Sequence, residues 1–241
     1  MSCPYGQCDG SGFLIDEEAN LARDCRCRAS RVARARARTL SAVIPRRYRH
    51  VAFDRPPVTH LAAPVVAEVR RFSQHIEERL DEGRGLWMLG EVGTGKTTLA
   101  MLVSRAALDA GRSVAIYSMP RLLNLIRDSM DSAGSKAELL DRLGAVDLLH
   151  LDDLGAENRT EWVLEQLYSI VNSRYEDERS VVVTTNLAPD ELREQIGART
   201  VSRLIEMCGD PLPLFGPDRR RELRLGADAL GDSFASELPG A

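Results

Sequence analysis

The stretch GEVGTGKT, from Gly90 to Thr97, carries the most specific chemical pattern in the sequence. It matches G-x-x-x-x-G-K-[ST] at every position. Glycines let such a loop wrap around phosphate oxygens, and the N-terminus of the helix that follows favours negative charge. We expect Lys96 to reach the β- and γ-phosphates of a nucleotide and Thr97 to ligate Mg²⁺. The residues expected to cradle the phosphates are Gly90, Glu91, Val92, Gly93, Thr94, Gly95, Lys96, Thr97 and Thr98.

The use of lysine at position 96 strengthens this interpretation. The chain contains 30 arginines but only two lysines, Lys96 and Lys136. Lysine presents a compact ammonium group, whereas arginine presents a planar fork. A chain that otherwise uses arginine therefore has lysine where a compact charge suits a phosphate group.

Two adjacent acids, Asp152 and Asp153, follow the apolar run in LLHLDDLG. At the end of a buried strand, Asp152 is placed to hold Mg²⁺, and Asp153 is placed to orient and polarise an attacking water molecule. Two acids at a strand end can also cap the next helix. The phosphate-binding pattern 56 residues before Asp152 favours the metal and water roles.

Polar residues at two later positions add to this pattern. Asn186 ends the run VVVTTN, where its amide can hydrogen-bond the attacking water or the γ-phosphate. Asparagine is also a common turn residue. Arg199 and Arg203 lie one helical turn apart in GARTVSRLIE. An arginine there can stabilise transition-state charge in a neighbouring subunit, but the spacing is equally typical of two surface arginines.

The elements that must position these residues alternate between short apolar runs and helical periodicity. Strands are predicted in GLWML, SVAIYSM, VDLLHLDDLG and SVVVTTN. Helices are predicted in TLAMLVSRAALDA, RLLNLIRDSM, AELLDRL and TEWVLEQLYSIVNSRYED. This alternation indicates an α/β fold around a parallel sheet.

Four of the five cysteines, Cys3, Cys8, Cys25 and Cys27, lie in the first 27 residues. Cys3-x4-Cys8 has the usual spacing of a zinc half-site, whereas Cys25-x-Cys27 is tighter than the usual pair. Two short strands, in FLI and LARDC, are predicted on either side of the turn DEEAN. A segment this small needs a metal to fold, so we expect a closed structural Zn²⁺ site. Free or redox-active cysteines are the alternative.

The bulk composition, 44% hydrophobic and 28% charged, is ordinary for a globular protein. No apolar run approaches the roughly 18 residues that span a bilayer, and no signal peptide is evident. We therefore expect a cytoplasmic protein with no membrane partner. Residues 1–50 hold 10 arginines against 5 acids, whereas the remainder holds 22 basic and 31 acidic residues. The basic part indicates contact with phosphates or an acidic surface, or else a solvated linker.

The order of GEVGTGKTT, VDLLHLDDLG, VVVTTN and ARTVSRL resembles that of the AAA+ ATPases of the DnaC/DnaI helicase-loader and IstB type, over about residues 40–215. The resemblance implies a P-loop NTPase fold, ATP as the nucleotide and hydrolysis to ADP and phosphate. It implies that Asn186 is the sensor-1 residue and that Arg203 is the arginine finger, with Arg199 as a second arginine. It also places Tyr48 and Phe53, in PRRYRHVAFD, near the adenine.

The chain departs from the family pattern in two places. The family often has Asp-Glu where this chain has Asp152-Asp153, which suits slow, switch-like hydrolysis stimulated by self-assembly or DNA. Only 26 residues follow Phe215, too few for the helical lid of many AAA+ proteins. The candidates for a sensor-2 arginine are therefore Arg219, Arg220 and Arg221.

Four segments are expected. They are a Cys-rich zinc-binding module at 1–28, a basic linker at 29–60, an AAA+ ATPase domain at 61–215 and a short C-terminal tail at 216–241. In helicase loaders and replication initiators the helical region before the second motif contacts single-stranded DNA, which implies that Arg121 and Arg127 are the basic residues available for it.

The leading functional hypothesis is an ATP-dependent loader of a replicative helicase onto single-stranded DNA, with self-association through the ATP site. A cysteine-ligated N-terminal module resembles that of loaders in which this part docks on the helicase. IstB-type helpers of transposition, which act on duplex DNA, typically lack it. A small-molecule P-loop kinase is disfavoured because no acceptor-binding motif is evident. A protein that holds nucleotide without turnover is the remaining alternative.

Overall fold

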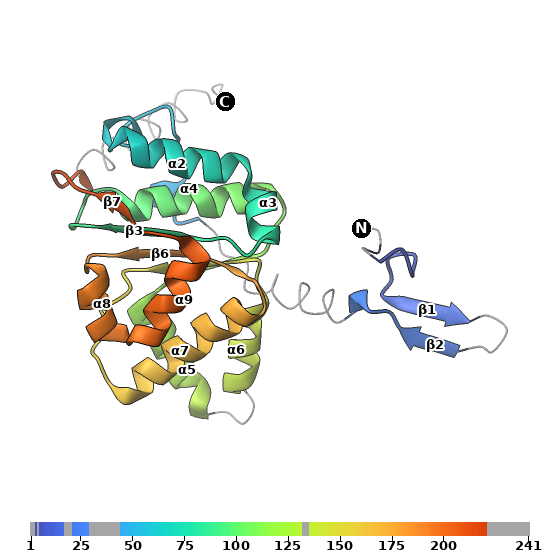
Figure 1. The fold of residues 1–241 in the computed structure, drawn as a ribbon. Helices are drawn as coiled ribbons and strands as arrows, with labels where there is room; N and C mark the ends of the chain where they lie inside the picture. The colour runs from blue at the N-terminus through green and yellow to red at the C-terminus, as the bar shows by residue number, and fades with distance from the viewer. Residues whose placement is uncertain (1–2, 4, 17–20, 29–43, 132–134, 221–241) are drawn as a thin grey trace, which may run out of the picture.

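A five-stranded parallel sheet is the centre of the computed structural model, which describes residues 3, 5–16, 21–28, 44–131 and 135–220 (Figure 1). The strands follow the order β4-β5-β6-β3-β7. Their bounds are β3 Leu86–Gly90, β4 Val114–Ser118, β5 Leu148–Asp152, β6 Ser180–Thr185 and β7 Leu212–Leu214. The predicted α/β class and parallel sheet are confirmed, since every neighbouring pair of these strands is parallel.

Helices cover both faces of the sheet (Figure 1). One face packs against α2 Ala63–Gln74, α3 Ile76–Asp81 and α4 Lys96–Asp109. The other packs against α5 Met119–Asp128, α6 Ser135–Ala145, α7 Glu161–Glu176, α8 Pro189–Ile196 and α9 Ala198–Cys208. Short 3-10 helices are η1 Arg46–Tyr48, η2 Val58–His60 and η3 Ser129–Asp131. None of the helices within the described ranges is long and apolar enough to cross a membrane.

The apolar runs of the sequence explain the strands at the centre of the sheet. All six residues of β6, SVVVTT, are buried, as expected for a strand covered by helices on both faces. At the start of α7 the hydroxyl of Thr160 accepts a hydrogen bond from the backbone N–H of Val163, which caps the helix. The sheet is therefore held between two apolar cores, one on each face.

Residues 44–60, which we assigned to a basic linker, pack against the core. Their buried members are Ile44, Tyr48, Val51, Pro57 and Val58. Arg105 of α4 also donates to the carbonyl oxygens of Tyr48 and Val51. The linker boundary at residue 60 is therefore wrong, because the packed domain already includes Ile44. Residues 29–43 lie outside the described part of the chain.

Two short strands near the N-terminus pair as the sequence predicts. β1 Phe13–Asp16 and β2 Leu21–Asp24 are antiparallel, with Phe13 opposite Asp24 and Asp16 opposite Leu21. The turn between them, residues 17–20, is outside the described ranges. The hairpin carries Cys25 and Cys27 just beyond its second strand.

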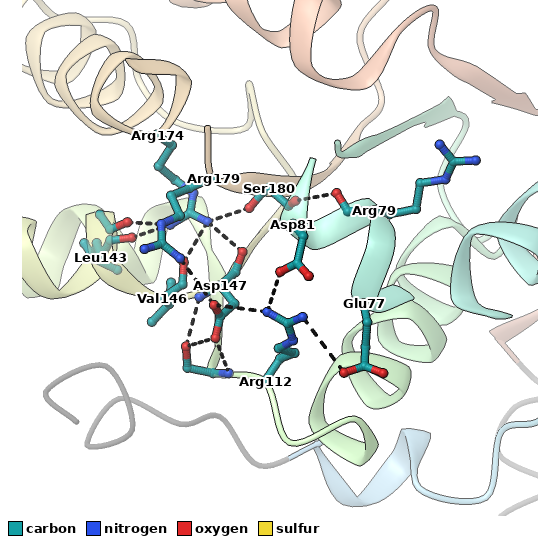
Figure 2. A network of polar contacts seen from close by, with 12 residues as sticks. Glu77, Arg79, Asp81, Arg112, Leu143, Val146, Asp147, Arg174, Arg179 and Ser180 are labelled. Carbon is teal, nitrogen blue, oxygen red and sulfur yellow. Dashed lines mark hydrogen bonds and ion pairs between the residues drawn. The ribbon is translucent and has the colours of Figure 1, made fainter. Parts of the chain in front are cut away.

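A buried arginine forms hydrogen bonds with several elements near the N-terminal ends of β5 and β6 (Figure 2). Arg174 of α7 is fully buried and donates to five carbonyl oxygens, those of Leu143, Gly144, Val146, Asp147 and Ser180. Burial lowers the pKa of Arg174 to about 9, so the group is still protonated at neutral pH. Nearby, the buried Asp147 carboxylate accepts hydrogen bonds from the backbone and hydroxyl of Ser113 and pairs with Arg179 at 3.3 Å.

Candidate functional site

A cavity of about 550 Å³ lies at the edge of the sheet where the carboxyl ends of β5, β6 and β3 meet. Parallel strands bring the residues that follow them to one edge, which is the usual binding edge of an open α/β sheet. Among the residues that line the cavity are Lys96, Thr97, Asp152, Asp153 and Asn186. The structure therefore brings together the three motifs that the sequence separates by up to 90 residues.

The loop between β3 and α4 forms one wall of this cavity. Gly93 and Gly95 adopt left-handed conformations, with φ of 81° and 101°, which glycine adopts without steric strain. Lys96 begins α4, is 5% exposed, and its Nζ donates to the carbonyl oxygens of Gly90 and Glu91, at 2.7 Å each. Burial lowers the pKa of Lys96, and the charges of Asp153 and Asp152 oppose that shift. The ammonium group is thus held at the loop, facing the acid pair.

Asp152 and Thr97 form the part of the site suited to a divalent cation. Asp152 Oδ1 accepts hydrogen bonds from Thr97 Oγ1 at 2.9 Å and Thr184 Oγ1 at 2.7 Å, and His150 Nε2 lies 3.8 Å away. Burial raises the pKa of Asp152, but His150 and the two hydroxyl donors outweigh burial and lower it overall. An ionised carboxylate beside a hydroxyl is an oxygen donor set that fits Mg²⁺.

Asp153 has a different environment from its neighbour. Its backbone is left-handed, with φ of 57°, and its N–H donates to Thr184 Oγ1 at 3.0 Å. Aspartate and asparagine tolerate this conformation better than most residues. Burial raises the pKa of Asp153, and the charge of Asp152 raises it further. Adjacent carboxyl groups with opposite pKa shifts suit two roles, one as cation ligand and one as proton acceptor.

The remaining predicted catalytic residues are placed in two different regions. Asn186 follows β6 directly and lines the cavity. Neither Arg199 nor Arg203 is among the described residues that line it. Arg203 lies on α9, where its Nε donates to Asn172 Oδ1 at 2.5 Å and its guanidinium lies over the rings of Tyr168 and Tyr175, at 5.5 and 4.9 Å.

Of the two aromatic residues expected near the base, only one is in the cavity. Tyr48 is buried and lines it. Phe53 instead lines a separate hollow beside α2, where Arg70 lies over its ring at 5.2 Å. Phe53 is therefore not among the described residues that line the cavity.

Arginines from both ends of the domain complete the cavity lining. Arg219 and Arg220 line it, and the backbone N–H of Arg219 donates to Gly93 O at 2.9 Å. Arg221, the third sensor-2 candidate, lies outside the described residues. Arg47 also lines the cavity. Sequence reasoning missed Arg47 because nothing in its arginine-rich surroundings distinguishes it from its neighbours.

The charges that line the cavity suit an anionic ligand. Four basic residues, Arg47, Lys96, Arg219 and Arg220, line the cavity together with Asp152 and Asp153. The lining therefore carries a basic excess of two charges when both acids are ionised. A triphosphate bound with Mg²⁺ carries the opposite charge, and a basic cleft concentrates such a ligand.

The four N-terminal cysteines converge on one point. Their Sγ atoms all lie within 4.8 Å of one another, with Cys3 and Cys25 at 3.7 Å and Cys8 and Cys27 at 3.5 Å. Disulfide sulfurs lie about 2.05 Å apart, so these are free thiols. In a tetrahedral site with Zn–S bonds of about 2.3 Å, neighbouring sulfurs lie about 3.8 Å apart. The four thiols therefore fit a zinc ion.

Comparisons with known proteins agree with this geometry. A family model described as IstB-like ATP binding protein matches residues 13–205. The replicative helicase loader DnaC of Escherichia coli strain K12 is 28% identical over 132 residues, which are 54% of this chain and 54% of DnaC. The replicative helicase loader DnaI of Bacillus subtilis strain 168 is 25% identical over 152 residues, 58% of this chain and 48% of DnaI.

A solved structure resembles the fold over about two thirds of this chain. The crystal structure of the DnaC helicase loader superposes with a TM-score of 0.56 at 26% identity, covering 64% of this chain and 89% of that one. The chain spans about half the length of the curated relatives it matches.

Proposed function

The chain belongs to the family of IstB-like ATP-binding proteins, and from this premise we propose that it is an ATP-dependent loader of a replicative helicase onto single-stranded DNA. One observation carries the proposal. The phosphate-binding loop, Asp152, Asp153 and Asn186 share one cavity in a chain that is 28% identical to the loader DnaC over 132 residues. The converging cysteines support the same choice, since a cysteine-ligated N-terminal module is what we propose docks on the helicase.

In the proposed reaction, Lys96 and the loop N–H groups bind the phosphates of ATP. Thr97 and Asp152 would hold Mg²⁺, which supplies charge neutralisation at the terminal phosphates. Asp153 orients the attacking water and accepts its proton, and the Asn186 amide holds the water or the γ-phosphate. Water adds to the γ-phosphorus as the bond to the ADP oxygen breaks, so the products are ADP and phosphate.

Arg203 would act on ATP bound by another copy of the chain, because it does not line the described part of its own cavity. Arg203→Ala should lower turnover by at least about 10²-fold, as expected for loss of an arginine finger. Lys96→Ala should be inactive as well, but it retains Arg203. Mixing the two inactive variants should restore part of the ATPase activity, measured as phosphate release. Wild-type turnover by Arg203→Ala alone would contradict a role in trans.

Zinc binding by the cysteines is proposed from their geometry and has its own test. The wild-type chain should carry close to one zinc ion, measured by elemental analysis, and Cys25→Ser should lose it. Cys208→Ser is the matched control, because Cys208 lies on α9 and is not part of the cluster. Equal zinc content in Cys25→Ser and Cys208→Ser, or none in the wild type, would rule out the site.

The loader function is tested with the purified replicative helicase of the same genome and a closed circle of single-stranded DNA. A circle has no end to thread, so a ring helicase reaches it only if a loader opens or assembles the ring. With ATP and Mg²⁺, the wild-type chain should bind the helicase and deposit it on the circle, whereas Lys96→Ala should not deposit it. Failure to associate with the helicase under any nucleotide condition would exclude this function.

The family description favours one alternative, an ATPase helper of DNA transposition. Such a helper would assemble on duplex DNA and act with a transposase. ATP-dependent filaments on double-stranded DNA, together with no association with the replicative helicase, would favour it over the loader.

A further inference from the structure

Arg47 is a basic residue of the cavity that lies outside the phosphate-binding, acidic and asparagine motifs. It precedes the phosphate-binding loop by more than 40 residues and reaches the cavity from the short helix η1. We propose that Arg47 binds the terminal phosphates of the nucleotide held in its own chain. This inference rests on the proposed nucleotide site and adds to it a residue supplied from the segment before the ATPase core.

The backbone that carries Arg47 is anchored to the helix that begins with the phosphate-binding lysine. Arg105 of α4 donates to the carbonyl oxygens of Tyr48 and, at 2.6 Å, of Val51. Tyr48 is only 5% exposed and packs in the core between the sheet and α4. The position of η1 relative to the phosphate-binding loop is therefore set by α4 itself.

The side chain of Arg47 is supported as well as its backbone. Its Nη2 donates to the hydroxyl of Tyr48 at 2.9 Å, and its guanidinium lies 4.8 Å from the centre of the same ring. Within the described part of the chain the other N–H groups of the planar fork have no hydrogen-bond partner, and a guanidinium matches a phosphate with two parallel hydrogen bonds. A guanidinium held before the ligand arrives loses less side-chain entropy on binding.

Arg47 lines the same cavity as Lys96 and Asp153, the residues proposed to act at the terminal phosphates. Burial and the charge of Asp152 raise the pKa of Asp153, and the charges of Lys96, Arg220 and Arg47 oppose that rise. Arg47 therefore acts on the same carboxyl group as the phosphate-binding lysine. A guanidinium in this neighbourhood suits an anionic group of the ligand.

The adjacent Arg46 gives a matched control. Both residues belong to the same 3-10 helix and are exposed, but Arg46 is not among the described residues that line the cavity. Substituting Arg46 or Arg47 removes the same charge from the same short segment. A general electrostatic effect would change both variants alike, whereas a direct contact changes only Arg47.

The test compares the affinities of full-length variants for MgATP and MgADP by competition with a fluorescent ATP analogue. Arg47→Ala should weaken MgATP binding about tenfold, as expected for one charged hydrogen-bonding group, and MgADP binding less than about threefold. Arg46→Ala should bind both nucleotides like the wild type. Arg47→Lys keeps the charge but lacks the planar fork. Its affinity for MgATP should therefore lie between those of Arg47→Ala and Arg46→Ala.

The outcomes separate this inference from the nucleotide site on which it rests. Lys96→Ala in the same assay reports whether the site binds nucleotide at all. If Lys96→Ala loses binding while Arg47→Ala matches Arg46→Ala, the role of Arg47 is wrong and the site stands. An equal loss of MgATP and MgADP in Arg47→Ala would also overturn the terminal-phosphate contact. If Arg47→Ala does not fold, the comparison of Arg47→Lys with the wild type decides by the same criteria.

Discussion

Replacing Asp153 with asparagine should lower the rate of ATP hydrolysis by about 10²–10³-fold while MgATP affinity stays within about threefold of the wild type. The expectation follows from the position of Asp153 in the cavity, where its carboxyl group is the candidate acceptor of the water proton. Asparagine has the same shape but accepts no proton at neutral pH. Phosphate release at saturating ATP measures the effect.

The backbone conformation at residue 153 accommodates this substitution. Residue 153 has φ of 57°, a conformation that asparagine also tolerates, so the fold at the strand end should be unchanged. Asp152→Asn is the contrasting variant, since Asp152 is bonded to the hydroxyls of Thr97 and Thr184 and would ligate Mg²⁺. It should reduce Mg²⁺-dependent ATP binding as well as turnover. Phosphate release at the background level in both the wild type and Asp153→Asn would instead favour a protein that holds nucleotide without hydrolysing it.

Replacing Arg174 with methionine should lower the free energy of unfolding by about 3–5 kcal/mol. Methionine fills much of the same volume but leaves five buried carbonyl oxygens without the donor that Arg174 provides (Figure 2). It also removes a positive charge close to the buried Asp147 carboxylate, whose other partners include Ser113 and Arg179. The change in the midpoint of urea unfolding measures the loss.

Arg179→Met is the matched control for Arg174→Met. Arg179 pairs with the same Asp147, but a quarter of its side chain is exposed, so its loss should cost no more than about 1 kcal/mol. If Arg174→Met is too unstable to purify, Arg174→Lys keeps the charge and should be measurably less stable than Arg179→Met. Equal stability of the Arg174 and Arg179 variants would show that the buried hydrogen bonds contribute little.

Local sequence patterns predict most of the central strands of this fold. The central strands are predictable because each is a short apolar run between turn residues, and SVVVTT in β6 is buried along its whole length. The edge strand β7 is missed, since Leu212–Leu214 is only three residues long and contains a proline. Its place is set by pairing with β3 next to the phosphate-binding loop, which is a tertiary contact.

The packing of residues 44–60 illustrates a second limit. Arginine and proline dominate the composition there and indicate a solvated linker, yet Tyr48 and Val51 are buried. Single apolar residues spaced along a basic segment show neither helical nor strand periodicity. The folded chain shows that Arg105 of α4 holds this segment in place by donating hydrogen bonds to the carbonyl oxygens of Tyr48 and Val51.

The residues of the candidate site also differ in whether the sequence predicts them. The phosphate-binding loop and the acid pair are contiguous motifs with fixed spacing, so the sequence indicates them directly. Arg47 lies far from those motifs in the chain and shares no pattern with them, whereas Arg219 and Arg220 are candidates only through the family resemblance. Among 30 arginines, residue type alone cannot distinguish these three.

Titration of the purified chain with MgATP by calorimetry, beside Lys96→Ala, tests the central claim most directly. That claim is that a triphosphate binds between the loop at 90–97 and the acids at 152–153. We expect one binding event per chain in the wild type and affinity at least about 100-fold weaker in Lys96→Ala, because the variant lacks the charged donor to the phosphates. Equal affinities in the two proteins would contradict the claim, and with it the proposed ATPase.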